Sequence, residues 1–244
     1  MKAMILAAGL GTRLRPLTNT APKALMDING MTMLEMAIRR LIKAGFDELI
    51  VNTHHFAEKI EKFLKDKNNF DIKIELSYEE ELLDTGGGLK KAAWFFDDNK
   101  PFALYNADIY CDMDLRSMYE DHIQKESLVT LAVKERKSNS YLLFDEEMLL
   151  KELLSSKRKH PDIKDDIENY VKLAFSGIHI ISPKFFSKMT EDGAFSIIEP
   201  YLRLVREGAE IRGFRMDDYF WRDMGSLEKL EELKKYTQAN GINI

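Results

Sequence analysis

Glycine, arginine and lysine residues gather near the N-terminus of the chain, in the segment 6–13 and at Lys23. Gly9 and Gly11 can adopt positive φ and let a ligand approach the backbone, and successive exposed N–H groups form a concavity that suits anions. The guanidinium of Arg13 binds phosphate oxygens through a planar fork, whereas the ammonium of Lys23 acts as a mobile point charge. Together these residues predict a binding site for a polyphosphate.

Two common phosphate-binding motifs do not fit this segment. A dinucleotide-binding fingerprint requires a third glycine where the chain has Leu14, and a P-loop requires Gly-Lys-Ser/Thr where it has Gly11-Thr12-Arg13. A bare Gly-x-Gly also occurs in surface loops whose glycines merely turn the chain. The cations beside the glycines still favour phosphate binding, through a motif that is neither the dinucleotide-binding fingerprint nor the P-loop.

Aspartates further along the chain could hold a metal ion. Asp108 follows the apolar segment 102–105, and a carboxylate at the end of a strand can hold Mg²⁺ against a phosphate oxygen. Asp112 and Asp114 allow a second interpretation, because Asp-x-Asp is the metal motif of many nucleotide-sugar glycosyltransferases. Asp114 is equally well placed to cap the N-terminus of a helix that starts at residue 115.

An α/β sheet is expected to position these residues, because apolar runs typical of buried strands alternate with segments of helical periodicity. Strands are predicted at residues 4–6, 48–52, 72–76, 102–105, 128–133, 141–144, 174–181 and 210–215, and residues 149–154 as a strand or a helical turn. Helices are predicted to start near Leu34, Phe56, Thr85, Asp114, Ser196 and Leu227. The alternation predicts a mostly parallel sheet covered on both faces. Ligands bind such sheets at the carboxyl ends of the strands, where the glycine segment and Asp108 both lie.

Composition and charge narrow the class of protein. A chain of 244 residues suits one large α/β domain, and its 45% hydrophobic and 32% charged residues are ordinary for a globular protein. No apolar run approaches the ~20 residues that span a bilayer, and no signal peptide is evident, so a cytoplasmic protein without a membrane segment is expected. The net charge of −5 argues against a nucleic-acid partner. The single Cys111 excludes an internal disulfide and is expected in the core.

The glycine segment, together with Pro22 and Lys23, resembles the signature of the sugar-1-phosphate nucleotidyltransferase family. Four further blocks carry the resemblance, at residues 83–88, 106–108, 175–178 and 221–225. The resemblance implies a single Rossmann-like domain over residues 1–244, similar to the glycosyltransferase-A fold, with a mixed, mostly parallel sheet flanked by helices. The chain is too short for the C-terminal left-handed β-helix domain of some members, so none is expected.

The resemblance also implies roles for single residues. Arg13 and Lys23 would be catalytic, and Asp108 and Asp223 would hold Mg²⁺. The implied nucleotide-binding residues are Leu6, Ala7, Ala8, Gly9, Gly11, Thr12, Arg13, Thr85, Gly86, Gly87, Gly88 and Asn106. The implied sugar-binding residues are Asn106, Ser176 and Gly177. Asp112 and Asp114 would be dispensable for the metal.

The substrates implied by the resemblance are a nucleoside triphosphate and a sugar 1-phosphate. The glycine triplet, the Phe-Ser-Gly-Ile strand and the Trp-x-Asp-x-Gly ending are most similar to members that join UTP to N-acetylmuramate 1-phosphate in cell-wall recycling. GTP stays open, because mannose- and heptose-1-phosphate guanylyltransferases also carry Thr-Gly-Gly. One departure concerns the sugar phosphate: many members hold it with the lysine of a Glu-Lys-Pro segment, which this chain lacks before Ser176.

Several features leave alternatives open. A catalytically silent sensor of nucleotide sugars would share the fold, although the presence of both cations and both metal-binding aspartates argues against it. The basic segment 157–160 is expected to be a solvated face, with a lid over an anionic substrate as the alternative. The five histidines lack metal-ligand spacing and are expected to be structural or exposed. The sequence does not decide between a monomer and a homo-oligomer.

Overall fold

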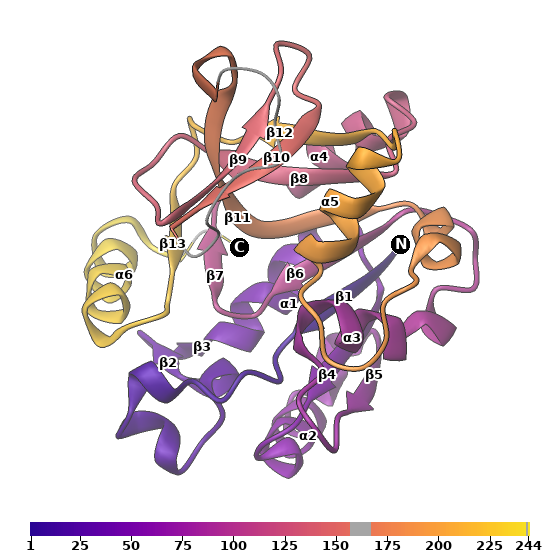
Figure 1. Ribbon diagram of the computed structural model, residues 1–244. Helices are drawn as coiled ribbons and strands as arrows, with labels where there is room; N and C mark the ends of the chain where they lie inside the picture. The colour runs from indigo at the N-terminus through magenta and orange to yellow at the C-terminus, as the bar shows by residue number, and fades with distance from the viewer. Residues whose placement is uncertain (157–166, 243) are drawn as a thin grey trace.

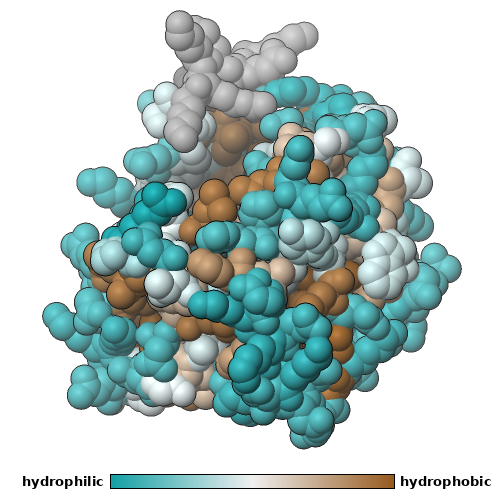
Figure 2. All heavy atoms as spheres, turned by 90° about the horizontal axis from the view of Figure 1, so that it is seen from below, coloured by the Kyte–Doolittle hydropathy of each residue, from teal (hydrophilic) through white to brown (hydrophobic). Residues whose placement is uncertain are grey.

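The centre of the molecule is a twisted sheet with helices on both faces, as the computed structural model shows (Figure 1). The structure describes residues 1–156, 167–242 and 244, so the predicted basic face at residues 157–160 lies outside the described part. Within the described residues the main sheet has nine strands, and no helix is long and apolar enough to cross a membrane. On the face seen in Figure 2, hydrophilic side chains surround smaller hydrophobic patches.

The strands and helices follow one another largely as the periodicity predicts. The strands are β1 (Lys2–Leu6), β2 (Asp27–Ile28), β3 (Met31–Thr32), β4 (Glu48–Thr53), β5 (Lys73–Tyr78), β6 (Phe102–Asn106), β7 (Ile109–Cys111), β8 (Val129–Lys134), β9 (Ser140–Phe144), β10 (Leu150–Ser155), β11 (Val171–Ile181), β12 (Ile211–Arg215) and β13 (Trp221–Asp223). The helices are α1 (Met33–Lys43), α2 (Ala57–Asp66), α3 (Asp84–Lys91), α4 (Leu115–Gln124), α5 (Ile198–Arg206) and α6 (Leu227–Asn240). The segment that could have been a helical turn is therefore a strand, β10.

The main sheet combines a parallel part with an antiparallel part. Its order is β10-β9-β11-β6-β1-β4-β5, and β8 lies beside β11 with β12 at its other edge. Strands β6, β1, β4 and β5 run parallel, whereas β11 is antiparallel to β6, β8 and β9. The predicted mixed α/β sheet is thus confirmed. The carboxyl ends of β1, β4 and β6 meet at one edge, where the glycine segment leaves the sheet.

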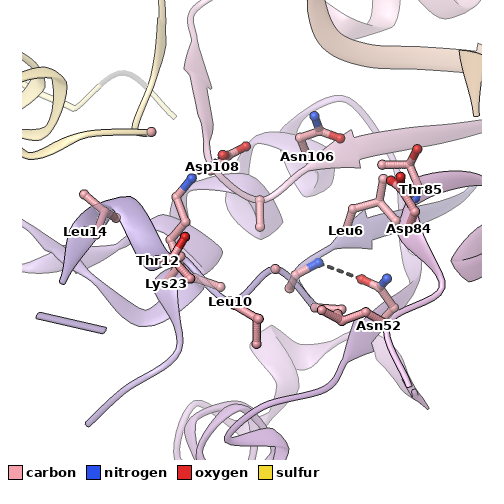
Figure 3. A pocket seen from close by; sticks show the side chains of 18 of the residues that line it. Leu6, Leu10, Thr12, Leu14, Lys23, Asn52, Asp84, Thr85, Asn106 and Asp108 are labelled. Carbon is pink, nitrogen blue, oxygen red and sulfur yellow. Dashed lines mark hydrogen bonds and ion pairs between the residues drawn. The ribbon is translucent and has the colours of Figure 1, made fainter. Parts of the chain in front are cut away.

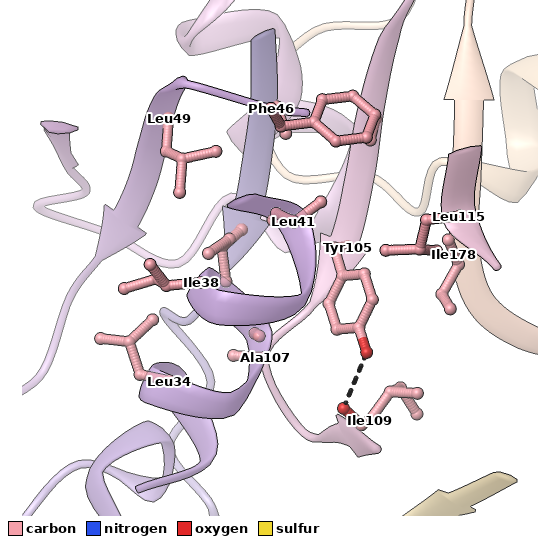
Figure 4. Close-up of a cluster of buried hydrophobic side chains, with 14 of the residues drawn as sticks. Leu34, Ile38, Leu41, Phe46, Leu49, Tyr105, Ala107, Ile109, Leu115 and Ile178 are labelled. Atoms are coloured by element: carbon pink, nitrogen blue, oxygen red, sulfur yellow. Dashed lines mark hydrogen bonds between the residues drawn. The ribbon is translucent and has the colours of Figure 1, made fainter. Parts of the chain in front are cut away.

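Alternate residues of β1 enter two different cores. Ile5 belongs to a cluster with Ile38 and Leu41 of α1, while Met4 packs on the opposite face with Leu89 of α3. Figure 4 shows the α1 side chains beside Tyr105 of β6. A fully buried Leu or Ile contributes about 1.5–3 kcal/mol, so these two layers hold the strand ends in a rigid frame.

A second, two-stranded sheet lies beside the main one and was not predicted. It pairs β7 with β13 in antiparallel register, with Trp221 opposite Cys111 and Asp223 opposite Ile109. Met224, the next residue, is fully buried in a third core cluster that also contains Leu230 of α6. This packing anchors the C-terminal part of the chain against the segment that follows Asp108.

Candidate active site

A cavity of about 590 Å³ opens at the carboxyl ends of β1, β4 and β6 (Figure 3). The segment 6–14 forms one wall, and further walls come from the ends of the three strands and from the start of α3. The lining residues outside that segment are Lys23, Ala24, Asn52, Glu79, Leu82, Asp84, Thr85, Asn106, Ala107, Asp108 and Gly225. The structure therefore brings most of the predicted nucleotide-binding residues to one cavity.

Position 11 of the loop must be a glycine for geometric reasons. Its φ of 62° lies in the left-handed region, and a Cβ at this position would come within 2.9 Å of both Lys23 and Thr18 side chains. Its carbonyl accepts hydrogen bonds from the Leu14 amide at 2.9 Å and the Thr18 hydroxyl at 2.9 Å. The loop is thus held in one shape that keeps Lys23 close to it.

The two predicted catalytic cations differ in their surroundings. Lys23 makes an ion pair with Asp108, and both side chains point toward one another in Figure 3. Arg13 is exposed, lines the cavity, and has no ion pair among the described residues. One cation is therefore already bound to a predicted metal ligand, while the other is free to meet an anion.

The pairing of β7 with β13 brings Asp223 next to Asp108. Asp223 lies opposite Ile109, and the amide of Met224 donates to the carbonyl of Asp108 at 2.9 Å. The carboxylate of Asp223 accepts from the Gly225 amide at 3.1 Å and makes an ion pair with Lys229. The backbone thus brings Asp223 beside Asp108, although of these residues only Asp108 and Gly225 line the cavity itself.

These two carboxylates suit Mg²⁺ in their number and chemistry. Each is balanced by a lysine ammonium, Lys23 or Lys229, so a cation already lies against each carboxylate. The described residues contain no cluster of three or more His, Cys, Asp or Glu side chains that could hold a metal ion alone. Mg²⁺ usually binds through one or two carboxylates plus phosphate oxygens and water, and the pair matches that pattern.

The two aspartates of the Asp-x-Asp motif are engaged by backbone amides. Asp114 caps α4, where its carboxylate accepts from the amides of Arg116 at 2.9 Å and Ser117 at 3.3 Å. Asp112 accepts from the amide of Phe220 at 2.7 Å. The predicted N-cap is confirmed, and these contacts give both residues a structural purpose.

The glycine triplet requires a correction. The resemblance implied that Gly86, Gly87 and Gly88 bind the nucleotide, yet they are buried in α3 and do not line the cavity. A Cβ on Gly86 would lie 2.3 Å from the Phe195 ring, and one on Gly87 would lie 2.3 Å from the carbonyl oxygen of Gly193. The close approach is made by the chain itself, and of the segment 85–88 Thr85 alone reaches the cavity.

A buried hydrogen-bond network that the sequence analysis missed connects the glycine segment to α3. Asn52 accepts from the Ala7 amide at 2.6 Å, drawn as a dashed line in Figure 3, and donates to Glu79 at 2.7 Å. The other oxygen of Glu79 accepts from the Leu83 amide at 3.0 Å. A Cβ on Gly88 would come within 2.7 Å of Glu79 and 3.0 Å of Asn52. The available signal was Asn52 at the end of one predicted strand and Glu79 three residues beyond the end of the next.

The predicted sugar-binding residues lie together, at a bend in β11. Gly177 has a φ of 79°, and a Cβ there would come within 2.8 Å of Ile109 and 3.0 Å of Asn106. The register of β11 against β8 shifts at this point, between Phe175 and His179. Asn106 lines the cavity, whereas Ser176 and Gly177 are not among its lining residues. The contacts with Ile109 and Asn106 explain why this strand position holds a glycine.

The remaining polar core residues are structural. His122 bonds to the Thr130 hydroxyl at 2.9 Å and His179 to the Tyr201 hydroxyl at 3.0 Å. Burial lowers the pKa of His122 to about 4 and the pKa of His179 to about 3, so both rings are neutral at pH 7. Cys111 is fully buried, which confirms its expected place in the core, and burial raises the pKa of its thiol.

Comparison with known proteins was made on both sequence and structure. A family described as "Nucleotidyl transferase" matches residues 2–240. A UTP–glucose-1-phosphate uridylyltransferase of Synechocystis is 30% identical over 93% of this chain and 61% of its own length. An N-acetylmuramate α-1-phosphate uridylyltransferase of Neisseria meningitidis is 28% identical over 98% of this chain and 99% of its own length. A mannose-1-phosphate guanyltransferase of Hypocrea jecorina is 29% identical over 92% of this chain and 61% of its own length.

The chain thus spans about three fifths of the length of two of these relatives and nearly all of the third. Among solved structures, a putative glucose-1-phosphate thymidylyltransferase of Bacillus anthracis superposes with a TM-score of 0.81. It is 19% identical, and the match covers 100% of this chain and 96% of that one. At this identity the superposition supports the fold alone.

Proposed function

The chain belongs to the nucleotidyl transferase family, and on this premise we propose that it transfers a nucleoside monophosphate from a nucleoside triphosphate to a sugar 1-phosphate. The products are a nucleotide sugar and pyrophosphate. The observation that carries the proposal is the meeting of the glycine loop, Arg13 and the Lys23–Asp108 pair at one cavity, with Asp223 beside it. These groups match the charges of a triphosphate that faces a second phosphate.

The reaction needs positioning and charge neutralisation more than proton transfer. An oxygen of the sugar phosphate attacks the α-phosphorus, and the bond to the pyrophosphate oxygen breaks in line, so that pyrophosphate leaves with the electron pair. The nucleophile is already anionic at neutral pH. Arg13 would stabilise the β- and γ-phosphates, and Lys23 the α-phosphate. Mg²⁺, held by Asp108 and Asp223, would add charge neutralisation at the reacting phosphates.

For the substrates we favour UTP and N-acetylmuramate 1-phosphate. The support is the motif resemblance and the Neisseria relative, which matches this chain over almost its whole length. A guanylyltransferase of mannose 1-phosphate is the second candidate, and the Hypocrea relative is the observation in its favour. We expect turnover with UTP to exceed turnover with GTP, at saturating sugar 1-phosphate.

A screen of four nucleoside triphosphates against a panel of sugar 1-phosphates tests the proposal. Pyrophosphate should form only when a triphosphate and a sugar 1-phosphate are both present. Tight binding of a nucleotide sugar without turnover against the whole panel would indicate a sensor. Release of a nucleoside diphosphate from a nucleotide sugar would indicate a glycosyltransferase.

A further inference from the structure

Arg136 is a half-buried cation that makes no ion pair with any residue of the described part of the chain. It follows β8, and its guanidinium carbon lies 4.0 Å from the centroid of the Trp221 ring. One terminal nitrogen donates to the carbonyl of Phe175 at 2.7 Å, while the buried Nε has no hydrogen-bond partner among the described residues. Burial lowers the pKa of Arg136, although the charge of Asp223 opposes this effect. A guanidinium held by a ring and one carbonyl keeps donors available for an anion.

The contacts of Arg136 place it on the side of the site assigned to the sugar. Trp221 and Asp223 are two residues apart on β13, so their side chains leave the strand on the same face. The indole nitrogen of Trp221 donates to the carbonyl of Ser176 at 2.9 Å. Arg136 therefore stacks on a residue that touches a predicted sugar-binding residue and neighbours a predicted metal ligand.

Three of the eight buried side-chain polar atoms that lack a hydrogen-bond partner among the described residues lie on this side. In the described part of the chain, the buried Oδ1 of Asn106 and the buried Oγ of Ser176 make no hydrogen bond, and neither does the Nε of Arg136. Buried polar groups in folded proteins are nearly always satisfied, and the exceptions need a physical reason. Asn106 lines the cavity, so a polar ligand there would supply its missing partner, whereas the hydroxyl of Ser176 is enclosed by the protein.

We propose that Arg136 binds an anionic group of the sugar substrate and so takes the place of the missing Glu-Lys-Pro lysine. The fork of donors suits either of two oxygen anions, the phosphate on C1 or a carboxylate carried by the sugar. The proposal rests on the proposed function, because it assumes that a sugar 1-phosphate occupies this side of the site. Arg136 then determines which sugar phosphates are bound, while the nucleotide is held elsewhere.

The test is steady-state kinetics of Arg136→Gln with two kinds of sugar 1-phosphate. In one kind the phosphate is the only charged group, and the other carries a carboxylate as well. A charge-assisted contact predicts a rise of roughly 10- to 100-fold in the KM of the sugar substrate, with the KM of the nucleoside triphosphate within about twofold of wild type. A rise for every sugar 1-phosphate identifies the C1 phosphate as the anion. A rise confined to the acidic sugar identifies the carboxylate.

Two further variants keep the result interpretable. Lys137→Gln removes a neighbouring exposed charge and should leave both KM values unchanged. Arg136→Lys keeps the charge but loses the planar fork, so its sugar KM should lie between those of wild type and Arg136→Gln. If the glutamine variant fails to fold, the lysine variant alone tests the proposal by a rise in the sugar KM. An unchanged sugar KM in both Arg136 variants, or an equal rise in both substrates, overturns the proposal. Absence of turnover in the wild-type enzyme would instead refute the proposed function.

Discussion

The two sides of the cavity differ in how completely the protein satisfies its own polar groups. On the proposed nucleotide side, Ala7, Asn52, Glu79 and Leu83 form a chain of hydrogen bonds between buried or half-buried groups, and only the neighbouring Thr53 hydroxyl stays without a partner in the described structure. On the proposed sugar side, Asn106, Ser176 and Arg136 retain buried polar atoms without partners in the described structure. We therefore expect the fold to preorganise the proposed nucleotide side more completely than the proposed sugar side.

The parallel and antiparallel parts of the sheet explain this division. Each parallel strand ends at the same edge, so the Ala7 amide after β1 reaches the Asn52 side chain near the end of β4, which in turn reaches Glu79 after β5. β11 instead enters this edge from the opposite direction and bends at Gly177, where its register shifts. A bulge re-aims side chains and leaves ladder groups unpaired.

The largest expected effect lies on the nucleotide side. Arg13→Ala and Lys23→Ala should each lower kcat by about two to three orders of magnitude, because removal of an aimed electrostatic contact typically costs ~2.7–4 kcal/mol of transition-state stabilisation. The measurement is steady-state kinetics with both substrates varied. Effects on KM alone would show that the two cations bind the ground state and the transition state equally.

The metal-binding pair should give the next largest effect. Asp108→Asn and Asp223→Asn should raise the Mg²⁺ concentration needed for half-maximal turnover at least about tenfold, since each removes one charged ligand. Asp112→Asn and Asp114→Asn are the matched controls, and they should leave the Mg²⁺ requirement unchanged. A metal defect in these controls, together with a normal requirement in Asp223→Asn, would instead support the glycosyltransferase interpretation.

A third change separates the glycine triplet from ligand binding. Gly88→Val places a side chain against Asn52 and Glu79, so it should disturb the network that holds the Ala7 amide. We expect the KM of the triphosphate to rise and the melting temperature to fall together. Asn52→Ala should reproduce both effects without added bulk at Gly88. A raised KM with an unchanged melting temperature in Gly88→Val would restore these glycines to the base site.

The sequence predicted the strands and the glycine loop well because both depend on local chemistry. A short window of sequence is enough to recognise an apolar run of strand length or a residue that tolerates positive φ. The β7–β13 pair was missed because each strand has three residues, too few for a periodicity. The Asn52–Glu79 network and the contact of the triplet with Phe195 were missed because their partners are distant in the sequence.

The last prediction concerns pH and the antiparallel part of the sheet, which holds His179 on β11 and the Thr130 partner of His122 on β8. Their pKa values, about 4 for His122 and about 3 for His179, lie below the 6.5 of a free histidine. Below pH 6.5 the two histidines therefore bind protons in the unfolded chain but stay neutral in the folded chain. The free energy of unfolding falls as the pH drops from 6.5 toward the folded-state pKa values.

Between pH 7 and pH 5 the two rings together should lower the free energy of unfolding by about 3–4 kcal/mol. Carboxylates with lowered pKa values, such as Asp145 and Glu191, lose their contribution only at more acidic pH, so this window isolates the histidines. Urea unfolding at pH 5, 6 and 7 measures the slope, and His179→Gln should reduce it to about half. If His179→Gln lowers stability but leaves the slope of the unfolding free energy against pH unchanged, His179 is not a source of the pH dependence. Loss of packing lowers stability equally at every pH, whereas loss of a titrating group reduces the slope.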